Sequence, residues 1–382
     1  MYLGNGIMNK NRGIILWGQR RIGKNSVKDY LKKRIHETYP DAYMPIELGS
    51  IGKSHNLKEV LAGLAFDTEN VILTDYEELY DDYVKAGLEN SSIKIENSED
   101  YMLEFRNFMS RFSALLRRKY KEETHIPLYY IDEFSYLYEW IEKGELDGKE
   151  FMRFWKSFIQ DYGICAIIIA QDNIPVWKAQ YENEFSCMNY DNEITYLMPD
   201  GAKELICDPC RLNGESRFSP DAVDYIYSLT RGSAFLIVIL CKSIIDYLNR
   251  NYTEKVTKAV VEIVLEKEFI ANKGIFVSQD FEPQIVDVSK VNHEADEMVK
   301  ANIRLLKEIA AKTVTAVKTP ISELLFLRDG NIEYSKEIFE RLKERKIINT
   351  EGDIYCSITM PLLKFHFLRE QGLMNREALN YV

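Results

Sequence analysis

The chain has 382 residues, of which 46% are hydrophobic and 29% charged, and its formal net charge is −11. This length suggests two or three domains, and the composition is that of a globular protein whose core needs no disulfide or metal to hold it together. The acidic balance excludes nucleic-acid binding over the whole surface, because such binding neutralises phosphates with basic side chains. The charge is uneven, however. Met298–Val382 holds 14 Lys and Arg against 11 Asp and Glu, so this tail is where nucleic acid would bind if it binds at all.

The sequence has no candidate membrane span and no disulfide framework. Its longest apolar runs, Ile164–Ala170 and Ala234–Cys241, are much shorter than the roughly 20 residues that cross a bilayer. The first apolar run, at residues 13–17, is too short for a signal peptide. The six cysteines show no regular spacing, which is typical of a reducing compartment. We therefore expect a soluble cytoplasmic protein without a membrane partner.

Strand-like apolar runs alternate with helical periodicity in the first half of the chain. The runs are short and nearly continuous in apolar residues, as in strands buried on both faces of a parallel sheet: Gly13–Trp17, Pro127–Ile131, Ile164–Ala170 and, as a fourth candidate, Ala42–Leu48. Helical patterns fill the gaps between them: Ser26–His36, Tyr101–Tyr120 and Phe151–Gln160. This alternation predicts an α/β domain with a three-layer parallel sheet over residues 1–198.

Helical patterns replace the apolar runs after Met198. The first group predicts a small helical lid domain over residues 199–295: Ala202–Cys207, Pro220–Leu229, Ala234–Asn249 and Val256–Glu268. The second group consists of three helices and a hairpin that turns at residues 351–353: Glu297–Ala311, Pro320–Leu325, Tyr334–Lys346 and Ile347–Ile358. Three helices followed by a hairpin predict a winged-helix domain over residues 296–382.

A phosphate-binding loop is predicted at residues 18–26, with the sequence GQRRIGKNS, between the first strand and the first helix. Its two glycines permit a tight turn whose N–H groups face phosphate oxygens, and Lys24 can reach the β- and γ-phosphates. The positive end of the following helix faces the same anion. The predicted nucleotide-binding residues are Gly18, Arg21, Ile22, Gly23, Lys24, Asn25 and Ser26. A surface turn with basic residues is the alternative, and the flanking strand and helix argue against it.

The loop departs at one position from the usual Walker A pattern. A Ser or Thr normally follows the lysine and binds Mg²⁺ through its hydroxyl group, whereas Asn25 stands here. The second half of the site is Asp132 with Glu133, directly after the strand that ends at Ile131. We expect Asp132, together with Asn25, to hold Mg²⁺ and Glu133 to activate the attacking water, as in a Walker B motif. The alternative is an acidic cap for the next helix.

The run Ile164–Ala170 ends at Gln171. A polar side chain at this place can contact the γ-phosphate or the attacking water. We expect Gln171 to act with Glu133 in catalysis, and a solvated start to the loop remains an equally good interpretation.

Taken together, these motifs resemble those of bacterial and archaeal P-loop ATPases of the AAA/STAND type. The resemblance covers about residues 12–370 and rests on WGQRRIGKNS at Trp17–Ser26, YIDEF at Tyr130–Phe134, QDNIPV at Gln171–Val176 and LTRGSAF at Leu229–Phe235. It implies ATP and Mg²⁺ as cofactors, bound between the sheet domain and the lid, and self-assembly or a change of domain angle on nucleotide binding. The family often has Gly-Gly-x-Pro where Arg231-Gly232-Ser233-Ala234 stands here.

Three further groups of residues could have a functional role, but an ordinary structural role is favoured for each. Cys207 and Cys210 form a CxxC without further ligands at zinc spacing, so ordinary cysteines are favoured. Arg211, Arg217 and Arg231 could reach a γ-phosphate, and surface ion pairing is the favoured alternative. The helix at 334–346 interleaves basic residues with glutamates, which favours a solvated or protein-docking face over DNA binding.

The sequence thus predicts an ATP-binding P-loop ATPase with slow hydrolysis that acts as a regulatory or defence switch on a protein partner. Asn25 favours a second hypothesis, a scaffold that binds ATP without hydrolysing it. A DNA-binding regulator that uses the winged helix is the third hypothesis.

Overall fold

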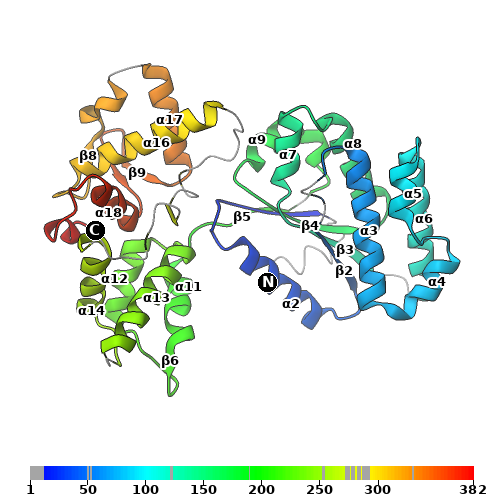
Figure 1. Cartoon of the computed structure of the whole chain (residues 1–382), viewed down its shortest axis with the longest axis horizontal. Helices are drawn as coiled ribbons and strands as arrows, with labels where there is room; N and C mark the ends of the chain where they lie inside the picture. The colour runs from blue at the N-terminus through cyan, green and yellow to red at the C-terminus, as the bar shows by residue number, and fades with distance from the viewer. Residues whose placement is uncertain are drawn as a thin grey trace. The chain divides into compact units, whose positions relative to one another are not determined.

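Figure 1 shows the computed structural model of the chain. It describes residues 13–49, 51, 54–120, 124–188, 190–251, 254–271, 276, 280, 281, 285, 293–328 and 331–382. The chain forms two compact units. One comprises Met1–Gly18 with Lys24–Ile194, and the other comprises Gln19–Gly23 with Thr195–Val382.

A five-stranded parallel sheet forms the centre of the first unit. Its strands lie in the order β2-β3-β4-β1-β5, where β1 is Gly13–Trp17, β2 Tyr43–Leu48, β3 Ile126–Ile131, β4 Cys165–Ala170 and β5 Tyr190–Glu193. The predicted α/β fold with a parallel sheet is confirmed. The sequence patterns gave no sign of β5, because its residues, YDNE, are polar and at least partly exposed.

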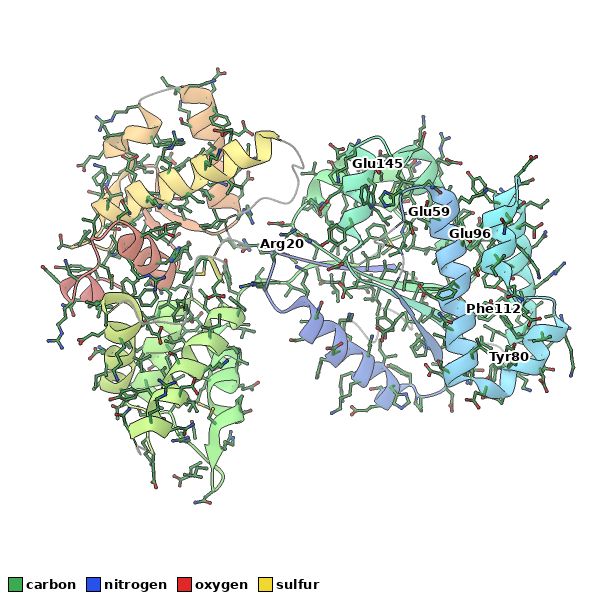
Figure 2. All side chains as sticks on the ribbon, in the orientation of Figure 1. Arg20, Glu59, Tyr80, Glu96, Phe112 and Glu145 are labelled. Atoms are coloured by element: carbon green, nitrogen blue, oxygen red, sulfur yellow. The ribbon has the colours of Figure 1, made fainter. Side chains whose placement is uncertain are left out.

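Helices cover the two faces of this sheet unequally (Figure 1). On one face, Leu31 and Ile35 of α2 (Lys24–Thr38) pack against Ile14, Leu16 and Tyr130. The opposite face holds a much larger core that draws on α3, α6, α7, α8 and α9. Phe112 of α6, labelled in Figure 2, is fully buried there. The helices of this core and the short ones beside them are α3 (Leu57–Asp75), α4 (Tyr80–Lys85), α5 (Ser91–Asn97), α6 (Tyr101–Lys119), α7 (Ser135–Glu142), α8 (Gly148–Asp161), α9 (Ile174–Gln180) and α10 (Glu182–Phe185).

The second unit begins with helices and a small hairpin. They are α11 (Pro199–Cys207), the hairpin β6–β7 (Arg211–Leu212 and Glu215–Ser216), α12 (Pro220–Thr230), α13 (Ala234–Asn251) and α14 (Lys258–Leu265), which continues into a π-helical turn at Glu266–Ile270. In the described part of this unit, each of the four helices predicted for the lid has a counterpart.

The rest of the second unit combines helices with a three-stranded sheet. Its elements are α16 (His293–Lys312), β8 (Thr319–Pro320), α17 (Ile332–Glu344), β9 (Ile348–Glu351), β10 (Tyr355–Ile358) and α18 (Pro361–Glu370), and the sheet order is β8-β10-β9. The prediction of a helix at residues 320–325 is wrong. Pro320 and Leu324 have extended backbones, so the segment forms β8 and two 3₁₀ turns, Ile321–Glu323 and Leu325–Leu327.

One continuous core joins these elements to the preceding helices, through residues such as Leu240, Leu305, Ile338 and Phe365. The domain boundaries at 198/199 and 295/296, and the assignment of the last part as a winged helix, therefore remain predictions. Within the described residues, every helix is too short or too polar to cross a membrane.

Candidate nucleotide-binding site

The predicted phosphate loop follows the central strand β1 and runs into α2. Lys24 is the first residue of α2, and its Nζ donates a hydrogen bond to the backbone oxygen of Gly18 at 2.9 Å. This contact closes the loop on itself. Gly23 has φ +106°, and nothing lies within 4 Å of the position its Cβ would occupy. Glycine is therefore required there by the backbone conformation rather than by space.

The middle of the loop, Gln19–Gly23, is grouped with the second unit. Arg21 has a positive φ of 60°. Its Nη1 lies 3.4 Å from Asp280 Oδ1, and its guanidinium carbon lies 4.2 Å from the centre of the Phe235 ring. Ile22 is buried, whereas Asn25 and Ser26 are exposed at the start of α2. Arg21 thus has an acidic neighbour, and its predicted contact with phosphate remains a prediction.

Asp132, the predicted Walker B aspartate, lies beside α2. Strand β4 separates β1 from β3, so the carboxyl ends of all three strands meet at one edge of the sheet, where open α/β sheets bind their ligands. Lys28 Nζ of α2 lies 2.7 Å from Asp132 Oδ2, across 104 positions of the sequence. The helix that follows the predicted phosphate loop therefore contacts the predicted Asp132 at the end of β3.

Lys28 is a sheltered basic residue in this part of the site. Its side chain is 14% exposed, and the other Asp132 oxygen, Oδ1, accepts the backbone N–H of Glu133 at 2.9 Å. Burial acts to lower the pKa of Lys28, but the hydrogen bond and negative charge of Asp132, together with the charges of Glu47 and Asp29, outweigh it, so the pKa is raised. The Lys28 side chain is therefore positively charged at neutral pH. Sequence analysis missed it, although its place one turn after Lys24 on the same helix face was a usable signal.

The predicted catalytic glutamate is held differently from its neighbour. Glu133 has φ +55°, a conformation that costs a non-glycine residue roughly 1–3 kcal/mol and is common at functional sites. Its side chain is exposed, and among the described residues its carboxylate has no recorded partner. A carboxylate in this state is accessible to a water molecule and able to accept a proton from it.

A buried hydrogen-bond network surrounds the end of β4. The backbone N–H of Gln171 donates to Ser135 Oγ at 2.7 Å, and the Ser135 hydroxyl donates to Asn173 Oδ1 at 2.9 Å. Asn173 is 1% exposed, and its Nδ2 has no hydrogen-bond partner in the described structure. Sequence analysis singled out Gln171 but missed Ser135 and Asn173, whose polarity beside two strand ends was the only signal.

The remaining candidates make local contacts in the described part of the chain, and their roles stay predictions. Arg211 pairs with Asp208 at 2.6 Å, and Arg217 Nε donates to the backbone oxygen of Glu254 at 2.9 Å. Cys207 and Cys210 are free thiols, and no group of three or more candidate metal ligands occurs in the described part of the chain.

The residues present fit Mg²⁺ poorly. Magnesium prefers a rigid octahedron of oxygen ligands, in which a P-loop protein supplies a hydroxyl and an acidic oxygen. Here the residue after Lys24 is the exposed Asn25, and both Asp132 oxygens are already engaged within the chain.

Comparison with known proteins supports the fold. No family model matches the sequence, and no curated protein matches it. A Walker-type ATPase of Pyrococcus abyssi is similar in structure, with a TM-score of 0.51 at 14% identity over 96% of this chain and 93% of that one. The ORC2 protein of Aeropyrum pernix aligns over 97% of this chain and 91% of that one, with a TM-score of 0.44 at 12% identity. The Holliday junction branch migration motor RuvB of Thermotoga maritima aligns over 91% and 84%, with a TM-score of 0.39 at 11% identity. The chain has the fold of a P-loop ATPase.

Proposed function

We propose that this protein binds ATP on the loop at residues 18–26, hydrolyses it slowly and acts in the cytoplasm as a nucleotide-dependent switch. The observation that carries the proposal is the contact between Lys28 and Asp132, which places the helix after the phosphate loop against the end of β3. Lys24 would hold the β- and γ-phosphates, and the positive end of α2 would face the same charge.

Hydrolysis would depend on two residues at neighbouring strand ends. Glu133 would take a proton from the attacking water, and Gln171, held at its backbone by Ser135, would orient the γ-phosphate or the water. A general base without a well-formed metal site favours slow turnover, which suits a switch better than a metabolic enzyme. The resemblance to AAA/STAND ATPases supports self-assembly, or a change in a protein partner, as the output of the switch.

Asn25 favours a second candidate, an ATP-binding scaffold that does not hydrolyse its nucleotide. A third candidate is a DNA-binding regulator, which would require a winged helix. The order of α16, β8, α17 and the β9–β10 hairpin suits such a domain. The charges of α17 argue against DNA, since Arg341 and Lys343 pair with glutamates on the same helix.

Single-turnover hydrolysis of radiolabelled ATP, measured beside ATP affinity, separates the first two candidates. The switch predicts phosphate release that Glu133→Gln slows by roughly a hundredfold, with affinity nearly unchanged. Glu145→Gln is the control, because Glu145 is an acidic residue that pairs with His55. Tight binding without phosphate release, in both the unmodified protein and Glu133→Gln, would exclude the enzyme and leave the scaffold. Salt-independent failure to shift a DNA duplex would exclude the DNA-binding candidate.

A further inference from the structure

Lys28 occupies a place that the phosphate loop does not explain. It lies four residues after Lys24 on α2, so both lysines project from one face of the helix. Whereas Lys24 bonds to the loop itself, Lys28 bonds to the aspartate that would normally help to bind a metal ion.

The contact between Lys28 and Asp132 differs from the surface ion pairs of the same helix. Lys33 and Glu37, for example, are 3.9 Å apart with side chains 73% and 45% exposed, whereas Lys28 and Asp132 are 2.7 Å apart and 14% and 30% exposed. Exposed pairs contribute little, but a short, sheltered, charge-assisted hydrogen bond holds its partners in place. Lys28 therefore stays on Asp132 as part of the site.

A magnesium ion would have to compete with this arrangement. Its entry would require Asp132 to release Lys28, and it would then place a divalent cation close to a displaced ammonium group. The other available ligand for the ion would be the amide oxygen of Asn25, which binds a hard cation more weakly than a carboxylate does. The hydroxyl that usually completes the site is absent at position 25, and a fixed positive charge is present at position 28.

On the basis of the proposed nucleotide binding, we propose that this chain binds ATP without a magnesium ion of its own, and that the Lys28 ammonium group on Asp132 takes the electrostatic place of the metal. Lysine is a compact point charge with three hydrogen-bond donors, so it can serve Asp132 and still face a polyphosphate. The class of ligand is then free nucleoside triphosphate rather than its magnesium complex.

The test is titration of the full chain with ATP, by isothermal calorimetry, in excess magnesium and in excess EDTA. For the unmodified protein we expect dissociation constants that agree within about threefold. Lys28→Met leaves Asp132 without its cation, so affinity in EDTA should fall by at least about tenfold and magnesium should restore most of it. Lys28→Arg keeps the charge and should remain insensitive to magnesium. Lys33→Met, on the exposed side of α2, is the matched control and should behave as the unmodified protein does.

A second measurement detects the metal directly. The electron paramagnetic resonance signal of free Mn²⁺ is first measured with an ATP analogue alone, which binds part of the metal in solution. Adding the unmodified protein should not lower this signal further. It should fall when Lys28→Met is combined with Asn25→Thr, because the double variant restores a carboxylate and a hydroxyl.

Each outcome decides a different question. An affinity of the unmodified protein that falls more than tenfold in EDTA would overturn the replacement of the metal by Lys28, while leaving the proposed ATP binding intact. A magnesium requirement that is the same in Lys28→Met as in the unmodified protein would also overturn it. Absence of ATP binding under both conditions, in a protein whose thermal unfolding is cooperative, would instead refute the proposed function. Thermal unfolding of Lys28→Met without nucleotide shows whether this variant is folded. If it is not, the comparison of ATP affinity in magnesium and in EDTA is made with Lys28→Arg instead.

Discussion

The Ser135 hydroxyl group donates its hydrogen to Asn173 Oδ1 at 2.9 Å and accepts the backbone N–H of Gln171 at 2.7 Å. One side chain at the start of α7 thus fixes the backbone at the end of β4 and an amide two residues beyond it. Because all three residues are buried, none of these groups can exchange its partner for bulk water.

Ser135→Ala should therefore destabilise the first unit by about 1–3 kcal/mol, since it removes the hydroxyl that bonds to a buried N–H and to a buried amide oxygen. It should also lower phosphate release more than ATP affinity, because Gln171 loses its anchor. Chemical denaturation and single-turnover kinetics measure the two effects. The control is Ser186→Ala at an exposed serine, and equal stability of the two variants would contradict the role of the network.

Lys24→Ala should lower ATP affinity by roughly a hundredfold, because it removes the charge-assisted contact with the phosphates. The fold should survive, since the Lys24 side chain is only partly buried at the start of α2. Calorimetric titration and a thermal unfolding curve provide the two measurements, with Lys33→Ala as a control on the same helix. Unchanged affinity in Lys24→Ala would remove the phosphate loop from the site.

Gly232→Ala should destabilise the second unit by about 3 kcal/mol or more, because two effects combine at this residue. Gly232 has φ +80°, and a Cβ there would lie 2.0 Å from the backbone oxygen of Leu197, whose N–H donates to Gly232 O at 2.8 Å. Gly214, with φ +85° and open space, is a matched control that isolates the conformational cost, about 1 kcal/mol. Urea denaturation that gave the same loss for Gly214→Ala would show that the close approach is unimportant.

The second unit should lose stability in mild acid because of His366. Burial lowers the pKa of this histidine to about 4, against the opposing charges of Glu370 and Asp280, while Arg369 and Lys307 act in the same direction as burial. The unfolded chain has the ordinary histidine pKa of about 6.5, so between these pH values it binds a proton that the folded chain does not. The free energy of unfolding should thus fall as pH decreases from about 6.5 to about 4, by as much as ~3 kcal/mol.

Urea midpoints measured across this pH range, compared between the unmodified protein and His366→Gln, isolate that contribution from the titration of carboxylates. His36→Gln, at an exposed histidine, is the control for the substitution itself. Parallel curves for the unmodified protein and His366→Gln would contradict the assignment.

The parts of the fold that the sequence predicted are those with a strong local pattern. The apolar runs of β1, β3 and β4 identify strands buried on both faces, and the glycines of the phosphate loop mark the start of α2. Strand β5 has no such pattern, because its place in the sheet comes from pairing with β1 rather than from its own YDNE sequence. Local propensity alone could not distinguish it from a polar loop.

The same limit applies to the site. Lys24, Asp132 and Glu133 belong to short motifs that can be read along the chain. The contact of Lys28 with Asp132 spans 104 positions, and the network of Ser135 joins two strand ends, so both depend on the order of strands in the sheet. Sequence spacing does not give that order, and these are the residues that distinguish this site from the usual pattern.

The unequal covering of the sheet has a consequence for local opening. Helix α2 buries only Leu31 and Ile35, whereas α3 on the other face buries nine residues. Segments with few buried apolar contacts open at the lowest free energy, so the backbone amides of α2 should exchange with solvent deuterium sooner than those of α3. Lys24 and Lys28 both lie on α2. ATP binding would therefore stabilise a helix that is weakly packed, and slower exchange along α2 would be its earliest visible sign.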